Sequence, residues 1–218
     1  MRFLLVGGGI LKDAGAIHRQ INITQYDFIL AVDHGFDHCR SLGLTPNLLM
    51  GDLDSIEEQR DPTEYRCEVR AFAPEKDETD LRLAVDYALS HGASTIDIIC
   101  ATGGRLDQFM GNLSLLEYMH AAAPTLCTRM IDERNVIRFL SPQVGRQQFQ
   151  NRSKYLSIIP VSAELCFSGE GLKYPATQLI VTRTEMVSIS NECTGDCYAI
   201  TLHSGKALLI ESKDTEDF

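Results

Sequence analysis

Two aspartates, Asp52 and Asp54, are separated by one residue and follow the apolar run Leu48–Met50. On an extended backbone, residues at i and i+2 point to the same face, so both carboxylates can reach one cation. Mg²⁺ suits such a pair because it takes one or two carboxylates and completes its shell with water and phosphate oxygens. A turn in which Asp54 or Ser55 caps the next helix accounts for the same residues. The pair alone leaves a metal site and a helix cap as alternatives.

Two further aspartates stand where other predicted elements begin or end. Asp33 follows the apolar run Phe28–Val32, and Asp80 stands at the start of a helical pattern. An aspartate at a helix start is commonly a cap, so capping is the alternative for Asp80. Capping by one residue does not account for the whole acidic segment Glu75–Asp80, which also contains Lys76. This segment is therefore a second candidate for binding a metal or a phosphate.

An arginine and two glycines follow the apolar run Ile96–Ala101, in the segment Gly103–Gln108. Glycines between a strand and a helix start allow an anion to approach the backbone closely. The guanidinium of Arg105 can donate two hydrogen bonds to one phosphate. An ion pair between Arg105 and Asp107 is the alternative. Together with the aspartates, this corner indicates metal-assisted phosphoryl transfer.

Two other motifs lack the residues that would complete them. The glycines Gly7–Gly9 follow the apolar run Phe3–Val6 but have neither the Lys-Ser/Thr ending of a P-loop nor the spacing of a dinucleotide fingerprint. We interpret them as a tight turn. His34 and His38 are four residues apart, as zinc ligands on a helix would be, but no third ligand follows at a suitable spacing. We expect these histidines to be solvated or packed.

Elements that could bring these residues together alternate along the first part of the chain. Apolar runs and helical patterns succeed each other as far as about Val136, which is typical of a parallel α/β sheet. Ligands bind such a sheet beyond the carboxyl ends of its strands, where the candidate residues stand. Short β-prone runs separated by turn residues then replace the helical patterns. We predict an α/β domain with a Rossmann-like parallel sheet at residues 1–142 and an all-β domain at residues 143–218.

The composition of the chain argues against two classes of binding partner, nucleic acids and membranes. A net charge of −10 over 218 residues argues against a nucleic-acid binder, although a bound metal can invert the local sign of a site. No apolar stretch approaches the length of a membrane span, so we expect no membrane partner. Seven cysteines without a framework of close pairs indicate reduced thiols and a cytoplasmic protein.

Five short motifs occur in order along the chain: Gly51–Ile56, Lys76–Asp80, Gly103–Gln108, Gly171–Pro175 and Ser188–Glu192. Each is common alone, but in this order and spacing they resemble the thiamine pyrophosphokinase family over nearly the whole chain. That family moves the pyrophosphoryl group of ATP to thiamine. The resemblance implies a catalytic α/β domain that binds ATP and Mg²⁺, followed by a thiamine-binding β-sandwich domain. It also implies a homodimer whose active sites are shared between subunits.

The resemblance assigns a role to each candidate residue. The implied metal ligands are Asp33, Asp52, Asp54 and Asp80. The implied ATP-binding residues are Lys76, Arg105 and Gln108. The implied catalytic residues are Asp80, Arg105 and Asp107. The implied thiamine-binding residues are Tyr174, Ser188, Ser190 and Asn191.

The implied reaction is an in-line attack of the thiamine hydroxyl on the β-phosphorus of ATP, which releases AMP. Asp80 or Asp107 would accept the hydroxyl proton, and Arg105 would stabilise the developing charge. Two other functions are alternatives. A Mg²⁺-dependent nucleotide phosphohydrolase would account for the aspartates but gives the β domain no task. A non-catalytic nucleotide-binding module would not need several carboxylates beside a phosphate.

Overall fold

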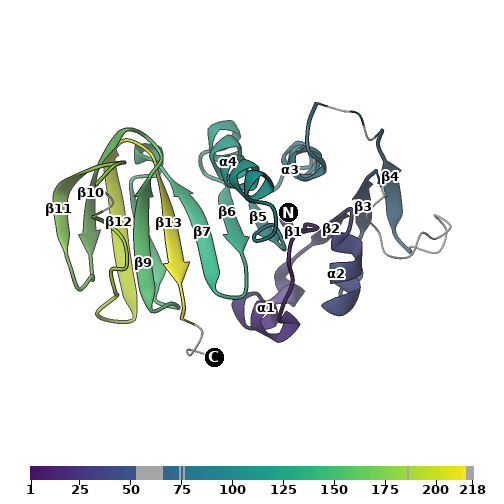
Figure 1. The fold of residues 1–218 in the computed structure, drawn as a ribbon, viewed down its shortest axis with the longest axis horizontal. Coiled ribbons are helices and arrows are strands. Elements are labelled where there is room, and N and C mark those ends of the chain that lie inside the picture. Colours follow the sequence, from purple (N-terminus) through teal and green to yellow (C-terminus); the bar gives the residue numbers. More distant parts are fainter. Residues whose placement is uncertain (53–65, 74, 76, 186, 215–218) are drawn as a thin grey trace. The chain divides into compact units, whose positions relative to one another are not determined.

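The computed structural model describes residues 1–52, 66–73, 75, 77–185 and 187–214. Asp54 and Lys76, which the resemblance places in the site, lie outside these described residues. The chain divides into two compact units, Met1–Glu133 and Arg134–Phe218. Figure 1 shows both units, coloured along the sequence.

The first unit is an α/β fold around a parallel sheet (Figure 1). Its strands pair in parallel in the order β4-β3-β2-β1-β5-β6. Their bounds are β1 (Arg2–Val6), β2 (Phe28–Val32), β3 (Leu48–Gly51), β4 (Glu68–Ala71), β5 (Thr95–Ile99) and β6 (Cys127–Ile131). Successive residues such as Leu4 and Leu5 are fully buried, as expected of strands covered on both faces. The parallel sheet predicted for this part of the chain is confirmed.

Helices cover both faces of this sheet, with α1 and α2 on one face and α3 and α4 on the other (Figure 1). Their bounds are α1 (Ala14–Gln20), α2 (Gly35–Ser41), α3 (Asp80–Ser90) and α4 (Leu106–Ala122), with a short 3₁₀ helix, η1 (Ile23–Gln25). The chain runs from β1 outward through β2, β3 and β4, then returns to place β5 on the other side of β1. Connections therefore leave β1 and β5 in opposite directions, and this opens a crevice at their carboxyl ends.

The second unit is all-β and resembles a sandwich of antiparallel layers. One layer pairs β7 (Asn135–Leu140), β13 (Ala207–Ser212) and β9 (Tyr155–Pro160). The other has the order β11-β10-β12-β8, formed by β11 (Ala176–Thr182), β10 (Glu164–Glu170), β12 (Cys197–Ser204) and β8 (Arg146–Gln150). A 3₁₀ helix, η3 (Pro142–Val144), precedes β8. Burial alternates along β9 and β10, and the inward residues, among them Leu156, Ile158 and Phe167, form one core.

The division between the units lies earlier than the boundary expected from the sequence. Residues 135–140 fall within the predicted first domain, which extends to residue 142. In the structure they form β7, whose whole length pairs antiparallel with β13. This ladder explains why the compact units divide between Glu133 and Arg134.

All seven cysteines are free thiols in the structure. Cys39 and Cys100 are buried in the first unit, and burial raises the pKa of the Cys100 thiol to about 12. Within the described part of the chain, no helix combines the length and hydrophobicity needed to cross a membrane.

Candidate active site

A cavity of about 990 Å³ lies at the carboxyl edge of the sheet in the first unit. It is lined by segments that follow β1, β2, β3 and β5 and by the start of α3. The predicted site residues in its lining are Asp33, Asp52, Asp80, Arg105 and Gln108. These residues are far apart in sequence, and the parallel sheet brings them together because the carboxyl ends of its strands share one edge.

The glycines Gly7–Gly9 line this cavity, so interpreting them as a turn alone was incomplete. The N–H of Gly7 donates to Ile99 O at 2.9 Å, and the N–H of Gly9 donates to Cys100 O at 2.7 Å. A Cβ at Gly9 would lie 2.7 Å from that same Cys100 oxygen. Glycine is therefore required where the loop after β1 contacts the segment after β5. The position of this loop after an apolar run is visible in the sequence. Its contact with the segment after β5 is not, because strand order cannot be read from a motif.

Asp33 lies directly against the end of β3, next to Asp52. Its backbone has a φ of 49°, and its N–H donates to Met50 O at 3.0 Å. A Cβ at Gly51 would lie 1.5 Å from Asp33 Oδ1. The glycine before Asp52 therefore makes the space that the Asp33 carboxylate occupies, and it brings both aspartates to one corner of the cavity.

At the start of α3, the N-cap residue and the first helical residue have different roles. The N-cap is Thr79, whose Oγ1 accepts from the N–H of Arg82 at 3.2 Å. Asp80 is in the first turn, where the partial positive charge of a helix N-terminus favours a carboxylate. Since Thr79 caps the helix, capping by Asp80 is not the reason for an aspartate at the cavity wall.

Arg105 and Asp107 form the ion pair that was the alternative to phosphate binding. Arg105 Nη2 donates to Asp107 Oδ2 at 2.6 Å, and Nε donates to Oδ1 at 3.1 Å. These bonds, with one from the Gln108 N–H, lower the pKa of Asp107 to about 2. The two side chains are 73% and 65% exposed, so solvent screens the pair. Arg105 lines the cavity, whereas Asp107, among the described residues, lies outside its lining.

The donor set of the cavity suits a hard divalent cation. Asp33, Asp52 and Asp80 supply carboxylate oxygens, and Glu78 adds a fourth carboxylate to the wall. Mg²⁺ needs one or two protein carboxylates and takes its other ligands from water and phosphate. Among the described residues, no group of three or more His, Cys, Asp or Glu side chains is placed so that it could hold a metal ion. Asp33 and Asp52, at one corner of the cavity, fit a cation that takes its other ligands from water and phosphate.

A second, smaller pocket of about 100 Å³ lies in the β unit. Its walls are mostly apolar, with Leu156, Phe167 and Leu172 among them. Three predicted thiamine residues also line it: Tyr174, Ser188 and Asn191. Ser190, which the structure does describe, lies outside this lining; its N–H donates to Ser157 Oγ at 3.0 Å, and its φ is 57°.

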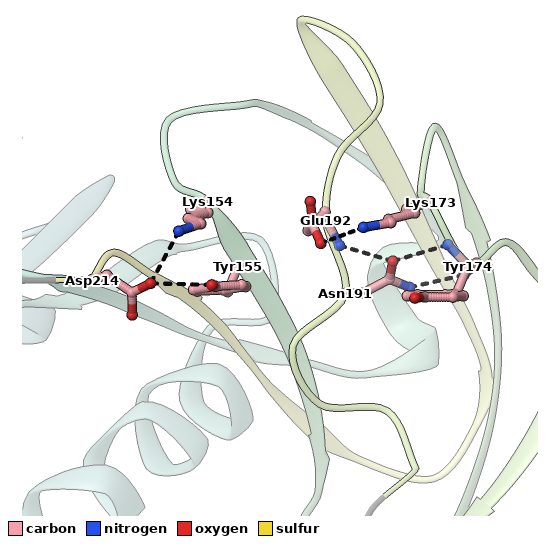
Figure 2. A network of polar contacts seen from close by, with 7 residues as sticks. All are labelled: Lys154, Tyr155, Lys173, Tyr174, Asn191, Glu192 and Asp214. Carbon is pink, nitrogen blue, oxygen red and sulfur yellow. Dashed lines mark hydrogen bonds and ion pairs between the residues drawn. The ribbon is translucent and has the colours of Figure 1, made fainter. Parts of the chain in front are cut away.

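The side chain of Asn191 holds the backbone around the pocket (Figure 2). Its Oδ1 accepts from the N–H of Tyr174 at 3.1 Å and from the N–H of Glu192 at 2.9 Å. Its Nδ2 donates to Tyr174 O at 2.8 Å. Beside it, Lys173 Nζ pairs with Glu192 Oε1 at 2.7 Å. Asn191 thus fixes the position of Tyr174, whose ring is the aromatic wall of the pocket.

Comparison with known proteins gives the same division into two parts. A family model described as thiamin pyrophosphokinase, catalytic domain, matches residues 20–128, and one described as thiamin pyrophosphokinase, vitamin B1 binding domain, matches residues 146–209. Thiamine pyrophosphokinase of Bacillus subtilis (strain 168) is 32% identical over 188 residues, which cover 85% of this chain and 87% of that protein.

Solved structures agree over nearly the full length. A crystal structure of thiamine pyrophosphokinase from Bacillus subtilis superposes with a TM-score of 0.86 at 30% identity, covering 98% of this chain and 100% of that one. A crystal structure of thiamin pyrophosphokinase from Geobacillus thermodenitrificans gives a TM-score of 0.83 at 27% identity, covering 100% of both chains. As the order of its motifs predicted, the chain belongs to the thiamine pyrophosphokinase family.

Proposed function

We propose that the protein transfers the pyrophosphoryl group of ATP to the hydroxyl of thiamine, giving thiamine diphosphate and AMP. Membership of the family supports this reaction. The observation that carries the proposal is one cavity whose lining contains Asp33, Asp52, Asp80 and Arg105 together with a glycine loop. Carboxylates for a metal and a guanidinium for a phosphate are the groups that phosphoryl transfer requires.

The first unit, in this proposal, binds ATP in the crevice of a Rossmann-like sheet. Mg²⁺ would be held by Asp33, Asp52, Asp54 and Asp80, and when bound it would neutralise charge on the phosphate oxygens. Arg105 turns from Asp107 to the phosphates, since a solvent-screened ion pair is easily exchanged for a multiply charged anion. Gln108 and Lys76 complete the ATP site, and the glycine loop leaves room for the phosphates.

The thiamine hydroxyl attacks the β-phosphorus in line, and its proton passes to a carboxylate. Asp80 is better suited to accept this proton than Asp107. Asp80 lines the cavity in which the phosphates are proposed to bind, whereas Asp107, among the described residues, lies outside its lining. Positioning of the two substrates contributes more than basicity, because the transition state of phosphoryl transfer is loose.

The second unit binds thiamine. Its pocket offers the ring of Tyr174 and apolar walls to a flat ligand, with Ser188 and Asn191 at the edge. Ser190 belongs to the same segment as Ser188 and Asn191, and in this proposal that segment borders the bound thiamine. We further propose, from the family resemblance, a homodimer in which each active site uses both subunits and, from the cysteine content, a cytoplasmic location.

The product assay tests the proposal directly. The protein is incubated with ATP, Mg²⁺ and thiamine, and the products are identified by mass. Thiamine diphosphate and AMP in equal amounts, absent when thiamine is omitted, are the expected result. Phosphate release that does not depend on thiamine would indicate a phosphohydrolase, and ATP binding without any product would indicate a binding module.

A further inference from the structure

His38 makes a short contact with the glycine loop. Its Nε2 lies 2.6 Å from Gly9 O. A carbonyl oxygen can only accept, so Nε2 carries a proton and donates it. The ring of His34 packs edge-on against His38, with ring centroids 4.6 Å apart, and both rings line the cavity. The expectation of packed or solvated histidines therefore missed a contact with the loop that borders the site.

The close approach of α2 to β1 makes this contact possible. A Cβ at Gly35 would lie 1.9 Å from Val6 O, so any other residue there would push the helix away. His38 follows Gly35 by about one helical turn and faces the same neighbouring segment. The packing of α2 against β1 thus places the imidazole of His38 next to the loop that follows β1.

The loop is held from two sides. On one side, the N–H groups of Gly7 and Gly9 donate to carbonyls at the end of β5. On the other side, the carbonyl of Gly9 accepts from His38. Glycine peptides rotate readily, because no Cβ restricts them. The N–H of the same peptide group, on Ile10, donates to Thr102 O at 3.3 Å, so His38 and Thr102 together set the orientation of this peptide at the edge of the cavity.

We propose that His38 is a positioning residue that fixes the Gly9 carbonyl and so keeps the glycine loop open to the phosphates of ATP. This rests on the proposed function of the cavity. The role belongs to the N–H at the Nε2 position and does not require the rest of the imidazole. Glutamine at position 38 can place an amide N–H near that atom, whereas asparagine is too short to do so.

The test compares His38→Gln with His38→Asn, with His18→Asn as the control, since His18 is exposed on α1. Calorimetry measures the Kd of MgATP, and steady-state kinetics measure the KM of ATP and of thiamine. In His38→Asn, the Kd and the KM for ATP should rise about tenfold while the KM for thiamine stays constant. His38→Gln should remain within about twofold of wild type, as should His18→Asn.

Each other outcome overturns the inference in a distinct way. Unchanged ATP binding in His38→Asn would show that the contact has no role in the site. Equal losses in His38→Gln and His38→Asn would show that a donor at Nε2 is not what matters. Equal rises in both KM values would indicate a general folding effect. Wild-type protein that binds no MgATP would contradict the proposed function, and the inference with it. If His38→Asn does not fold, His38→Leu replaces it.

Discussion

The cavity of the first unit and the pocket of the second differ in size and in what they offer a ligand. The cavity measures about 990 Å³ and is bordered by carboxylates, a guanidinium and glycine backbone. The pocket measures about 100 Å³, its walls are mostly apolar, and its polar side chains are bonded to neighbouring backbone. The cavity therefore suits a charged ligand, and the pocket suits a flat apolar ring that fits its shape.

The two folds account for this difference. In a parallel sheet the carboxyl ends of all strands lie on one edge, so side chains from distant segments gather there. In the antiparallel unit, alternation sends every second side chain into the core between the layers. A pocket at the border of such a core is apolar, and loops such as the one containing Ser188 and Asn191 add its few polar groups.

The largest expected effect concerns the carboxylates of the cavity. Asp80→Asn should lower kcat by about 10²- to 10⁴-fold, since it removes both a proposed metal ligand and the proposed proton acceptor. The exposed loop residue Asp196, changed to Asn, is the matched control and should leave kcat unchanged. Product formation from ATP and thiamine at saturating Mg²⁺ is the measurement. A near-normal rate in Asp80→Asn would remove this residue from the chemistry.

The next effect tests whether cavity and pocket act together across two chains. Mixing Asp80→Asn with Asn191→Ala gives mixed dimers as about half the population by random pairing, and each mixed dimer has one undamaged site if sites are shared. Activity at low thiamine should then recover to roughly a quarter of wild type. Mass measurement confirms subunit exchange. Activity at the mean of the two parents would place each site within a single chain.

A smaller effect is expected in the pocket. Asn191→Ala removes the hydrogen bonds that hold the backbone of Tyr174 and should raise the KM for thiamine roughly tenfold, with the KM for ATP unchanged. Tyr174→Phe is a suitable comparison, because it keeps the aromatic wall and should change the KM for thiamine much less. Kinetics with each substrate varied in turn provide the measurement. Equal effects of Asn191→Ala on both substrates would contradict a separate thiamine pocket.

The contrast between the parallel and the antiparallel unit also explains which features could be predicted from the sequence. Asp33, Asp52 and Arg105 follow apolar runs, and strand ends of a parallel sheet share an edge, so their approach to one cavity was predictable. The contact between Gly9 and Cys100 was not, because it depends on strand order, which local periodicity does not contain.

Loop geometry and the pairing of strands that are distant in the chain could not be predicted from the sequence either. Ser190 has a positive φ and lies outside the pocket lining, and no residue pattern signals either feature. Residues 135–140 lie where the sequence pattern changes, at about Val136, and within the first predicted domain. Their pairing with β13, at the far end of the chain, is visible only in the fold.

The smallest effect is expected for Asp107, which lies next to the cavity residue Gln108 but outside the described lining. Asp107→Asn should lower kcat at neutral pH by less than about threefold, because Asp107, unlike Asp80, lies outside the described lining of the cavity. The effect on stability has a defined sign. The pKa falls from 3.8 to about 2 in the folded protein, so Asp107 stabilises the fold above pH 3.8 and loses this contribution as the pH falls toward 2. Thermal unfolding of wild type and Asp107→Asn should therefore differ slightly at neutral pH and converge in acid. A loss of kcat as large as that of Asp80→Asn, with ATP binding intact, would make Asp107 the proton acceptor instead.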